Sequence, residues 1–203
     1  MNSLRLINGT PLRDGVPENI LDAKTREELR EWLSRHHSSE KECYVSCSRG
    51  SPPKDGSLWY VDVVEEAICF GWIDSITRRL DKDHHLKRFT PRRKGSTYSR
   101  PNIERLIWLD SHDMLHPTVK EQVGSIINTE YVYPKDIIRK LKKDNIVWEN
   151  FQSFSDSYKR IRIDYIDAAR GRPEEFRKRL DNFISKTREN KLIVGYGGVD
   201  KYY

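Results

Sequence analysis

Amphipathic patterning between residues 134 and 190 constrains the fold most strongly. Apolar side chains recur there three or four residues apart, which is typical of one buried helix face. Pro134, Ser155 and Pro173 stand at expected helix starts, because serine caps helices and proline suits their first turn. The four apolar sets are Ile137, Ile138 and Leu141; Trp148, Phe151 and Phe154; Tyr158, Ile161, Tyr165 and Ile166; and Phe176, Leu180, Phe183 and Ile184. We therefore predict a helical C-terminal region over residues 131–191.

Residues 25–130 mix short strand-like runs with helical ones. Thr25 and Glu28 match a helix capping box, and an apolar stripe follows them. Residues 42–47, 72–77 and 85–89 are interpreted as strands, with an antiparallel hairpin turn at 81–83. The predicted fold is α+β: a small antiparallel β-sheet packed by α-helices, with a helical C-terminal subdomain.

The ends of the chain carry turn residues and weak periodicity. Residues 1–24 are expected to form a partly flexible lead-in, and residues 192–203 a flexible tail. The first residues lack a signal-peptide pattern, and no apolar stretch is long enough to span a membrane. We therefore expect a cytoplasmic protein without membrane insertion.

The three cysteines do not indicate a disulfide framework or a metal site. Cys43 and Cys47 lie in one predicted strand, where four residues span roughly 13 Å, beyond the reach of a disulfide. With Cys69 they are expected to be buried thiols. His112 and His116 stand four residues apart, but Pro117 follows and no glutamate lies between them, so we predict no metal. No cofactor is predicted.

Positive charge is concentrated in particular segments. The chain has a net charge of +6, yet residues 78–100 alone hold nine Lys/Arg against two Asp, a net +7. Residues 135–191 hold sixteen Lys/Arg against ten Asp/Glu, a net +6. Segregation of this kind predicts a basic surface that attracts anions, although a solvated face would have the same composition.

The central residues resemble a known family. Residues 67–75, Ala-Ile-Cys-Phe-Gly-Trp-Ile-Asp-Ser, are similar to the Ala-Leu-Cys-Phe-Gly-Trp-Ile-Asp block of YdeI/OmpD-associated (bacteriocin-protection) proteins. Residues 88–96 resemble that family's Phe-Thr-Pro-Arg loop, and Tyr98 stands where the family usually has tryptophan. The resemblance covers about residues 25–190, including the tail, where Ala-Ala-Arg-Gly at 168–171 departs from the family pattern.

The resemblance implies a bacterial, cytosolic stress-response protein linked to tolerance of bacteriocins or cationic antimicrobial peptides. It also implies a small sheet flanked by helices, and it carries no agreed reaction. The charge of the basic loop adds a separate expectation, that the protein binds an anionic ligand there.

The residues predicted to bind this ligand lie around the basic loop. Asp74 is expected to pair with Arg88 across neighbouring strands and to orient it, while Ser99 caps the following helix. Arginine and free helix N-terminal amides both suit phosphate-like anions. The predicted ligand-binding residues are Trp72, Asp74, Arg88, Arg92, Arg93, Lys94, Ser96, Tyr98, Ser99 and Asn102.

Three alternatives stay open. The constellation can be purely structural, with Asp74 neutralising a buried arginine. The protein can instead be a nucleic-acid- or protein-binding module, in which the interleaved aromatic residues stack bases, although no known nucleic-acid motif is present. An enzyme acting on an anionic small molecule is the third alternative. No complete catalytic motif occurs, so we expect binding rather than catalysis.

Overall fold

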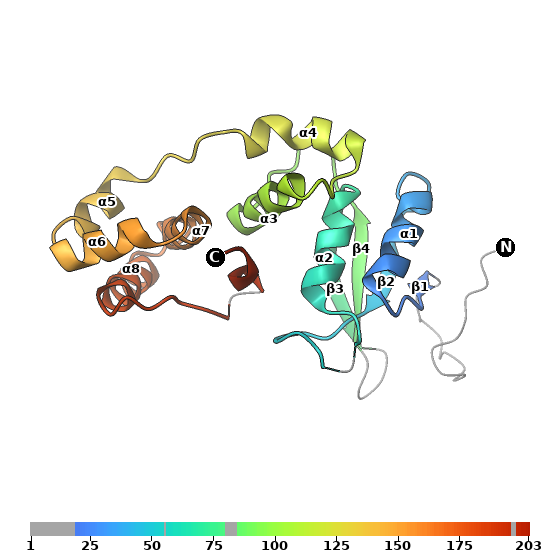
Figure 1. Cartoon of the computed structure of the whole chain (residues 1–203), viewed down its shortest axis with the longest axis horizontal. Helices are drawn as coiled ribbons and strands as arrows, with labels where there is room; N and C mark the ends of the chain where they lie inside the picture. The colour runs from blue at the N-terminus through green and yellow to red at the C-terminus, as the bar shows by residue number, and fades with distance from the viewer. Residues whose placement is uncertain (1–18, 55, 80–84, 196–197) are drawn as a thin grey trace. The chain divides into compact units, whose positions relative to one another are not determined.

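The structure, a computed structural model, describes residues 19–54, 56–79, 85–195 and 198–203 (Figure 1). The chain folds as two compact units. Unit 1 consists of Met1–Thr97 and Leu109–Gln122, and unit 2 of Tyr98–Trp108 and Val123–Tyr203. Most of the expected lead-in and the expected turn at 81–83 fall outside the described residues.

Unit 1 contains the sheet, whose strand order is β1-β2-β4-β3. The strands are β1 Ile20–Leu21, β2 Cys43–Ser46, β3 Trp72–Arg79 and β4 His85–Pro91. β2 and β3 both pair with β4 in antiparallel register, as the hairpin pattern predicts. The parallel pairing of β1 with β2 was not predicted, because two residues are too few to show a period.

Helices α1 (Arg26–His36) and α2 (Tyr60–Cys69) lie on one face of this sheet (Figure 1). Thr25 caps α1 as predicted, because its side chain accepts from the Glu28 amide. The Glu28 side chain also reaches back, but it accepts at 2.7 Å from the amide of Lys24, the residue before the cap, rather than from that of Thr25. Leu29 and Leu33, on the inner face of α1, are buried. The opposite face of the sheet carries a smaller buried cluster, formed by Ile20, Tyr44 and Leu86.

Strand β3 contains an irregularity that changes which side chains share a face. Its pairing with β4 shifts register between Asp74 and Thr77. Strict alternation predicts Arg78 on the same face as Asp74. Instead, the Arg78 guanidinium lies 5.9 Å from the centre of the Tyr44 ring, on the opposite face. The shift is a β-bulge, which reverses the alternation that follows it.

Helices α3 (Arg100–Ser111) and α4 (Pro117–Ile127) each contribute residues to both units. The rest of unit 2 is helical. Its elements are α5 Lys135–Leu141, α6 Asn145–Ser153, α7 Asp156–Asp167, α8 Pro173–Arg188 and the 3-10 helix η2 Val199–Tyr202. Ser155 caps α7 and Pro173 begins α8, as predicted. The α+β fold with a helical C-terminal part is thus confirmed.

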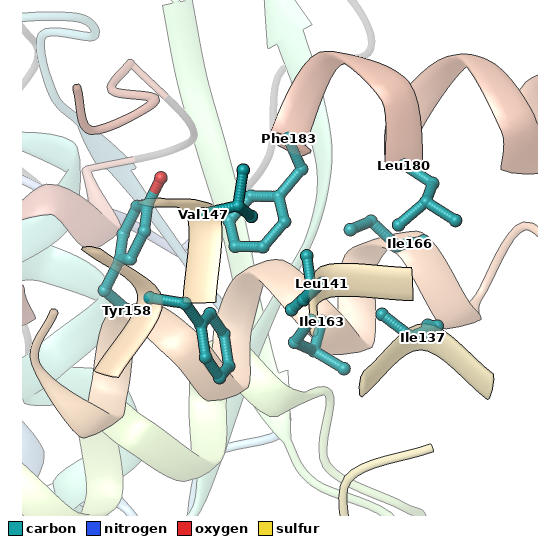
Figure 2. Packing of buried hydrophobic residues seen from close by; sticks show 9 residues of the cluster. Ile137, Leu141, Val147, Tyr158, Ile163, Ile166, Leu180 and Phe183 are labelled. Atoms are coloured by element: carbon teal, nitrogen blue, oxygen red, sulfur yellow. The ribbon is translucent and has the colours of Figure 1, made fainter. Parts of the chain in front are cut away.

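The core of unit 2 gathers most of the predicted apolar residues (Figure 2). Two of them lie outside it, contrary to the prediction: Ile161 packs in a separate cluster, and the half-buried Tyr165 belongs to neither cluster. Figure 2 shows side chains of α5 to α8 pointing toward one another, with Tyr158 and Phe183 among the largest. The cluster consists of Ile137, Leu141, Val147, Phe151, Tyr158, Ile163, Ile166, Leu180 and Phe183. In the C-terminal segment, Val199 and Tyr202 are buried against Ile161. Apolar burial of this kind is the main force that holds short helices together.

Candidate functional site

The predicted basic loop is a braced turn at the end of β4. The Arg92 amide donates to the Gly71 carbonyl at 2.8 Å, and the Arg92 guanidinium donates to the Thr97 carbonyl. The Ser96 hydroxyl donates to the Arg93 carbonyl at 2.8 Å. Gly95 has a φ of 77°, a conformation that favours glycine. The loop therefore has a defined shape rather than an open extended path.

Two cations lie at the tip of this turn, which we call the basic turn (Arg93–Ser96). Arg93 and Lys94 are both exposed, and neither contacts a carboxylate among the residues that the structure describes. Arginine and lysine without acidic partners keep their full attraction for an anion. The basic turn is thus a place where uncompensated positive charge is held on an ordered backbone.

Asp74 does not pair with Arg88, so that prediction is wrong. The Asp74 carboxylate accepts from the Tyr60 hydroxyl at 2.8 Å and lies 2.9 Å from the Lys87 ammonium. Arg88 is paired with Glu42 instead, at 2.6 Å. Consecutive strand residues point to opposite faces, and Lys87, not Arg88, shares the helix-covered face with Asp74. The hydrogen bond from Arg88 to Glu42 raises the pKa of Arg88.

The remaining predicted residues are divided between the two units. Trp72 is buried, and its indole N–H donates to the His37 carbonyl at 3.0 Å. Tyr98, Ser99 and Asn102 belong to unit 2, where Ser99 directly precedes α3 and Asn102 accepts from Arg105. Within unit 1, the structure brings Arg92, Arg93, Lys94 and Ser96 together, and places Asp74 and Arg88 on opposite faces of the sheet.

Sequence reasoning missed the partners Tyr60, Lys87 and Glu42. Lys87 is only 8% exposed, and its ammonium also donates to the Ser75 carbonyl at 2.8 Å. A lysine at a position where the strand alternation predicts a core-facing side chain indicates a buried charge. Such a charge needs a carboxylate partner. The alternation at 86–89 could have revealed Lys87, but nothing local could have paired it with Tyr60.

The cysteines are free thiols, with Cys43 and Cys69 buried as expected and Cys47 partly buried. Burial raises the pKa of Cys47 to about 11, although Arg49 and Lys87 lower it in part. Burial likewise raises the pKa of Cys43 and of Cys69 to about 12. Such thiols stay protonated near neutral pH, whereas the thiolate is the nucleophilic form.

The two histidines at 112 and 116 have different neighbours. The His112 ring nitrogen lies 3.1 Å from the Ser111 hydroxyl, while the His116 ring lies 4.7 Å from that of His37. Within the described parts of the chain, no three His, Cys, Asp or Glu side chains are grouped so as to hold a metal ion. Nor does any described helix have the length and apolar character required to cross a membrane.

The fold is that of a two-unit α+β protein, with an exposed basic turn in unit 1. Residues 21–122, half of the chain, match the family model described as Domain of unknown function (DUF8412), and the chain belongs to that family. Residues 130–190 match the model described as Bacteriocin-protection, YdeI or OmpD-Associated. No curated protein and no solved structure matches the chain.

These matches confirm the resemblance to the bacteriocin-protection family, and they assign it to the helices α5 to α8. The central blocks at 67–75 and 88–96 lie instead within the residues that match the domain of unknown function. The chain thus combines two family signatures, one in the sheet-containing half and one in the helical half.

Proposed function

We propose that this protein is a cytoplasmic bacteriocin-protection protein of the stress-tolerance type, which binds a phosphate-like anion at the basic turn. The family match at residues 130–190 supports the physiological role. The observation that carries the anion binding is the pair of exposed cations, Arg93 and Lys94, on a turn braced by Arg92 and Ser96. A braced loop loses less conformational entropy on binding than a mobile one.

The test is a thermal-shift titration of the full chain with inorganic phosphate and pyrophosphate. A ligand that binds only the folded state stabilises it, by about 2.7 kcal/mol at a concentration about 100 times its Kd. We expect wild type to be stabilised and the double variant Arg93→Ala, Lys94→Ala to lose that stabilisation. The effect should weaken with salt, because the site is exposed.

The matched control is the double variant Lys41→Ala, Lys54→Ala. Both lysines are exposed in unit 1 and lie outside the basic turn, so this variant removes the same net charge. It should respond to phosphate as wild type does. An equal loss of stabilisation in both double variants would contradict the proposal, since it would show general attraction to a positively charged chain.

A further inference from the structure

One concave surface lies wholly within unit 2. It is a pocket of about 670 Å³, and we call it the aromatic pocket. The residues that matter for its chemistry are Lys135, Arg139, Lys142, Trp148, Phe151 and Lys159. Pockets that hold small molecules have volumes of roughly 300–1,000 Å³. This pocket therefore has the size of a small-molecule site.

One side of the aromatic pocket is cationic. Lys135, Arg139 and Lys142 follow one another at i, i+4 and i+7 along α5 and its C-terminal cap, which places them on one helix face. All three are exposed, and none is paired with a carboxylate in the described part of the chain. Lys159, by contrast, is neutralised by Asp156 at 2.8 Å. The pocket thus carries three uncompensated positive charges.

The other side of the pocket is aromatic. The Trp148 and Phe151 rings have centres 5.6 Å apart and planes inclined by 24°. The Lys142 ammonium lies 4.8 Å from the centre of the Trp148 ring, so a cation and an aromatic face meet in the same site. Phe151 is buried in the core of unit 2, which fixes this wall. Trp148 is partly exposed and lines the pocket.

We propose that the aromatic pocket binds a small aromatic phosphate ester, with its ring against Trp148 and its phosphate among Lys135, Arg139 and Lys142. A bare inorganic anion would use only the cationic side, and a neutral aromatic molecule only the Trp148 wall. A ligand that carries both groups uses the two sides at once. All residues that line the pocket belong to unit 2, and none of them belongs to the basic turn.

Calorimetric titration of the full chain tests the proposal with three probes: 2-naphthyl phosphate, inorganic phosphate and 2-naphthol. We expect 2-naphthyl phosphate to bind at least about tenfold more tightly than inorganic phosphate, which lacks the ring, and than 2-naphthol, which lacks the charge. Equal affinity for 2-naphthyl phosphate and inorganic phosphate would overturn the role of the aromatic wall. No binding of 2-naphthyl phosphate would overturn the site.

Charge variants locate the binding. Arg139→Ala with Lys142→Ala should weaken the binding of 2-naphthyl phosphate by about tenfold or more, and Lys135→Ala gives a second, single-residue variant. Lys140→Ala with Lys143→Ala removes the same charge from exposed neighbours that do not line the pocket. This control, and the basic-turn variant Arg93→Ala with Lys94→Ala, should keep wild-type affinity. A similar loss in the Lys140, Lys143 control would contradict the proposal.

Discussion

At the scale of single residues, the most demanding feature is a charged cluster between α1 and α2. Glu65 and Glu66 are fully buried. Glu66 accepts from Arg26 at 2.6 Å and from Arg30 at 2.7 Å, and Arg26 also lies 2.7 Å from Glu65. Burial is the largest single effect on the pKa of each arginine, and it lowers that pKa. The contacts with the carboxylates together outweigh burial, so the pKa of both arginines is raised. Buried carboxylates are tolerated only with such partners.

Removal of one carboxylate from this cluster should be costly. Glu66→Ala removes the carboxylate that pairs with Arg30 and leaves Arg26 with Glu65 and Asp62. A guanidinium group at the edge of a buried cluster then lacks its counter-charge, so we expect the free energy of unfolding to fall by about 3–5 kcal/mol. Chemical denaturation measures it. Glu31→Ala is the control, because Glu31 and Arg35 form an exposed pair, and such a pair contributes at most about 1 kcal/mol. Similar losses of unfolding free energy in both variants would contradict the prediction, because the buried cluster would then contribute no more than an exposed ion pair.

Residue identity alone predicted some contacts and not others. Thr25 and Ser155 cap helices through hydrogen bonds that span three residues, and Pro173 suits a first helical turn because its φ is fixed. Local sequence was therefore sufficient at all three positions. The pairing of Asp74 with Lys87 depends on strand register and on a bulge, and neither is encoded in a short segment. The cations of the aromatic pocket had a readable i, i+4, i+7 spacing, but the hollow beside them depends on the packing of separate helices.

At the scale of elements, the end of α1 is joined to the segment before α4 by a pair of histidine rings. The His37 and His116 rings lie 4.7 Å apart, and both contact Phe70. The pKa of His116 is lowered by burial, then by His37 and Arg30, which face it. Protonation of His116 is therefore harder in the folded protein than in the unfolded chain.

This histidine pair predicts a pH dependence of stability. The unfolded chain binds the proton more readily, so the contribution of His116 is fully present above about pH 6.5 and is lost as the pH falls through its lower folded pKa. We expect urea denaturation midpoints to drop between about pH 8 and pH 5.5, and to drop less in His116→Gln. His112→Gln, a substitution at an exposed site, should retain the wild-type drop. An unchanged pH dependence in His116→Gln would contradict the assignment.

Periodicity predicted the elements of unit 2 better than those of unit 1. Helices α5 to α8 carry long apolar stripes, and most residues of these stripes form one core. Strand β1 has two residues, and β3 is interrupted by a bulge, so neither presents a clean period. Short strands are specified by their partners more than by their own sequences.

At the scale of the whole molecule, two family signatures coincide with two proposed anion sites. The basic turn lies in the half that matches the domain of unknown function, and the aromatic pocket lies in the half that matches the bacteriocin-protection family. Each site has exposed cations that no described carboxylate neutralises. The net charge of +6 therefore reflects local excesses of positive charge, which the proposals assign to ligand binding.

The central claim is that the basic turn holds an anion. The most direct measurement is a titration of the full chain with inorganic phosphate. Its readout is the change in backbone amide chemical shifts in NMR spectra. The account predicts saturable shifts that are largest at Arg93, Lys94, Gly95 and Ser96, and that disappear in Arg93→Ala with Lys94→Ala. Small shifts spread evenly over the exposed lysines and arginines, without saturation, would contradict it.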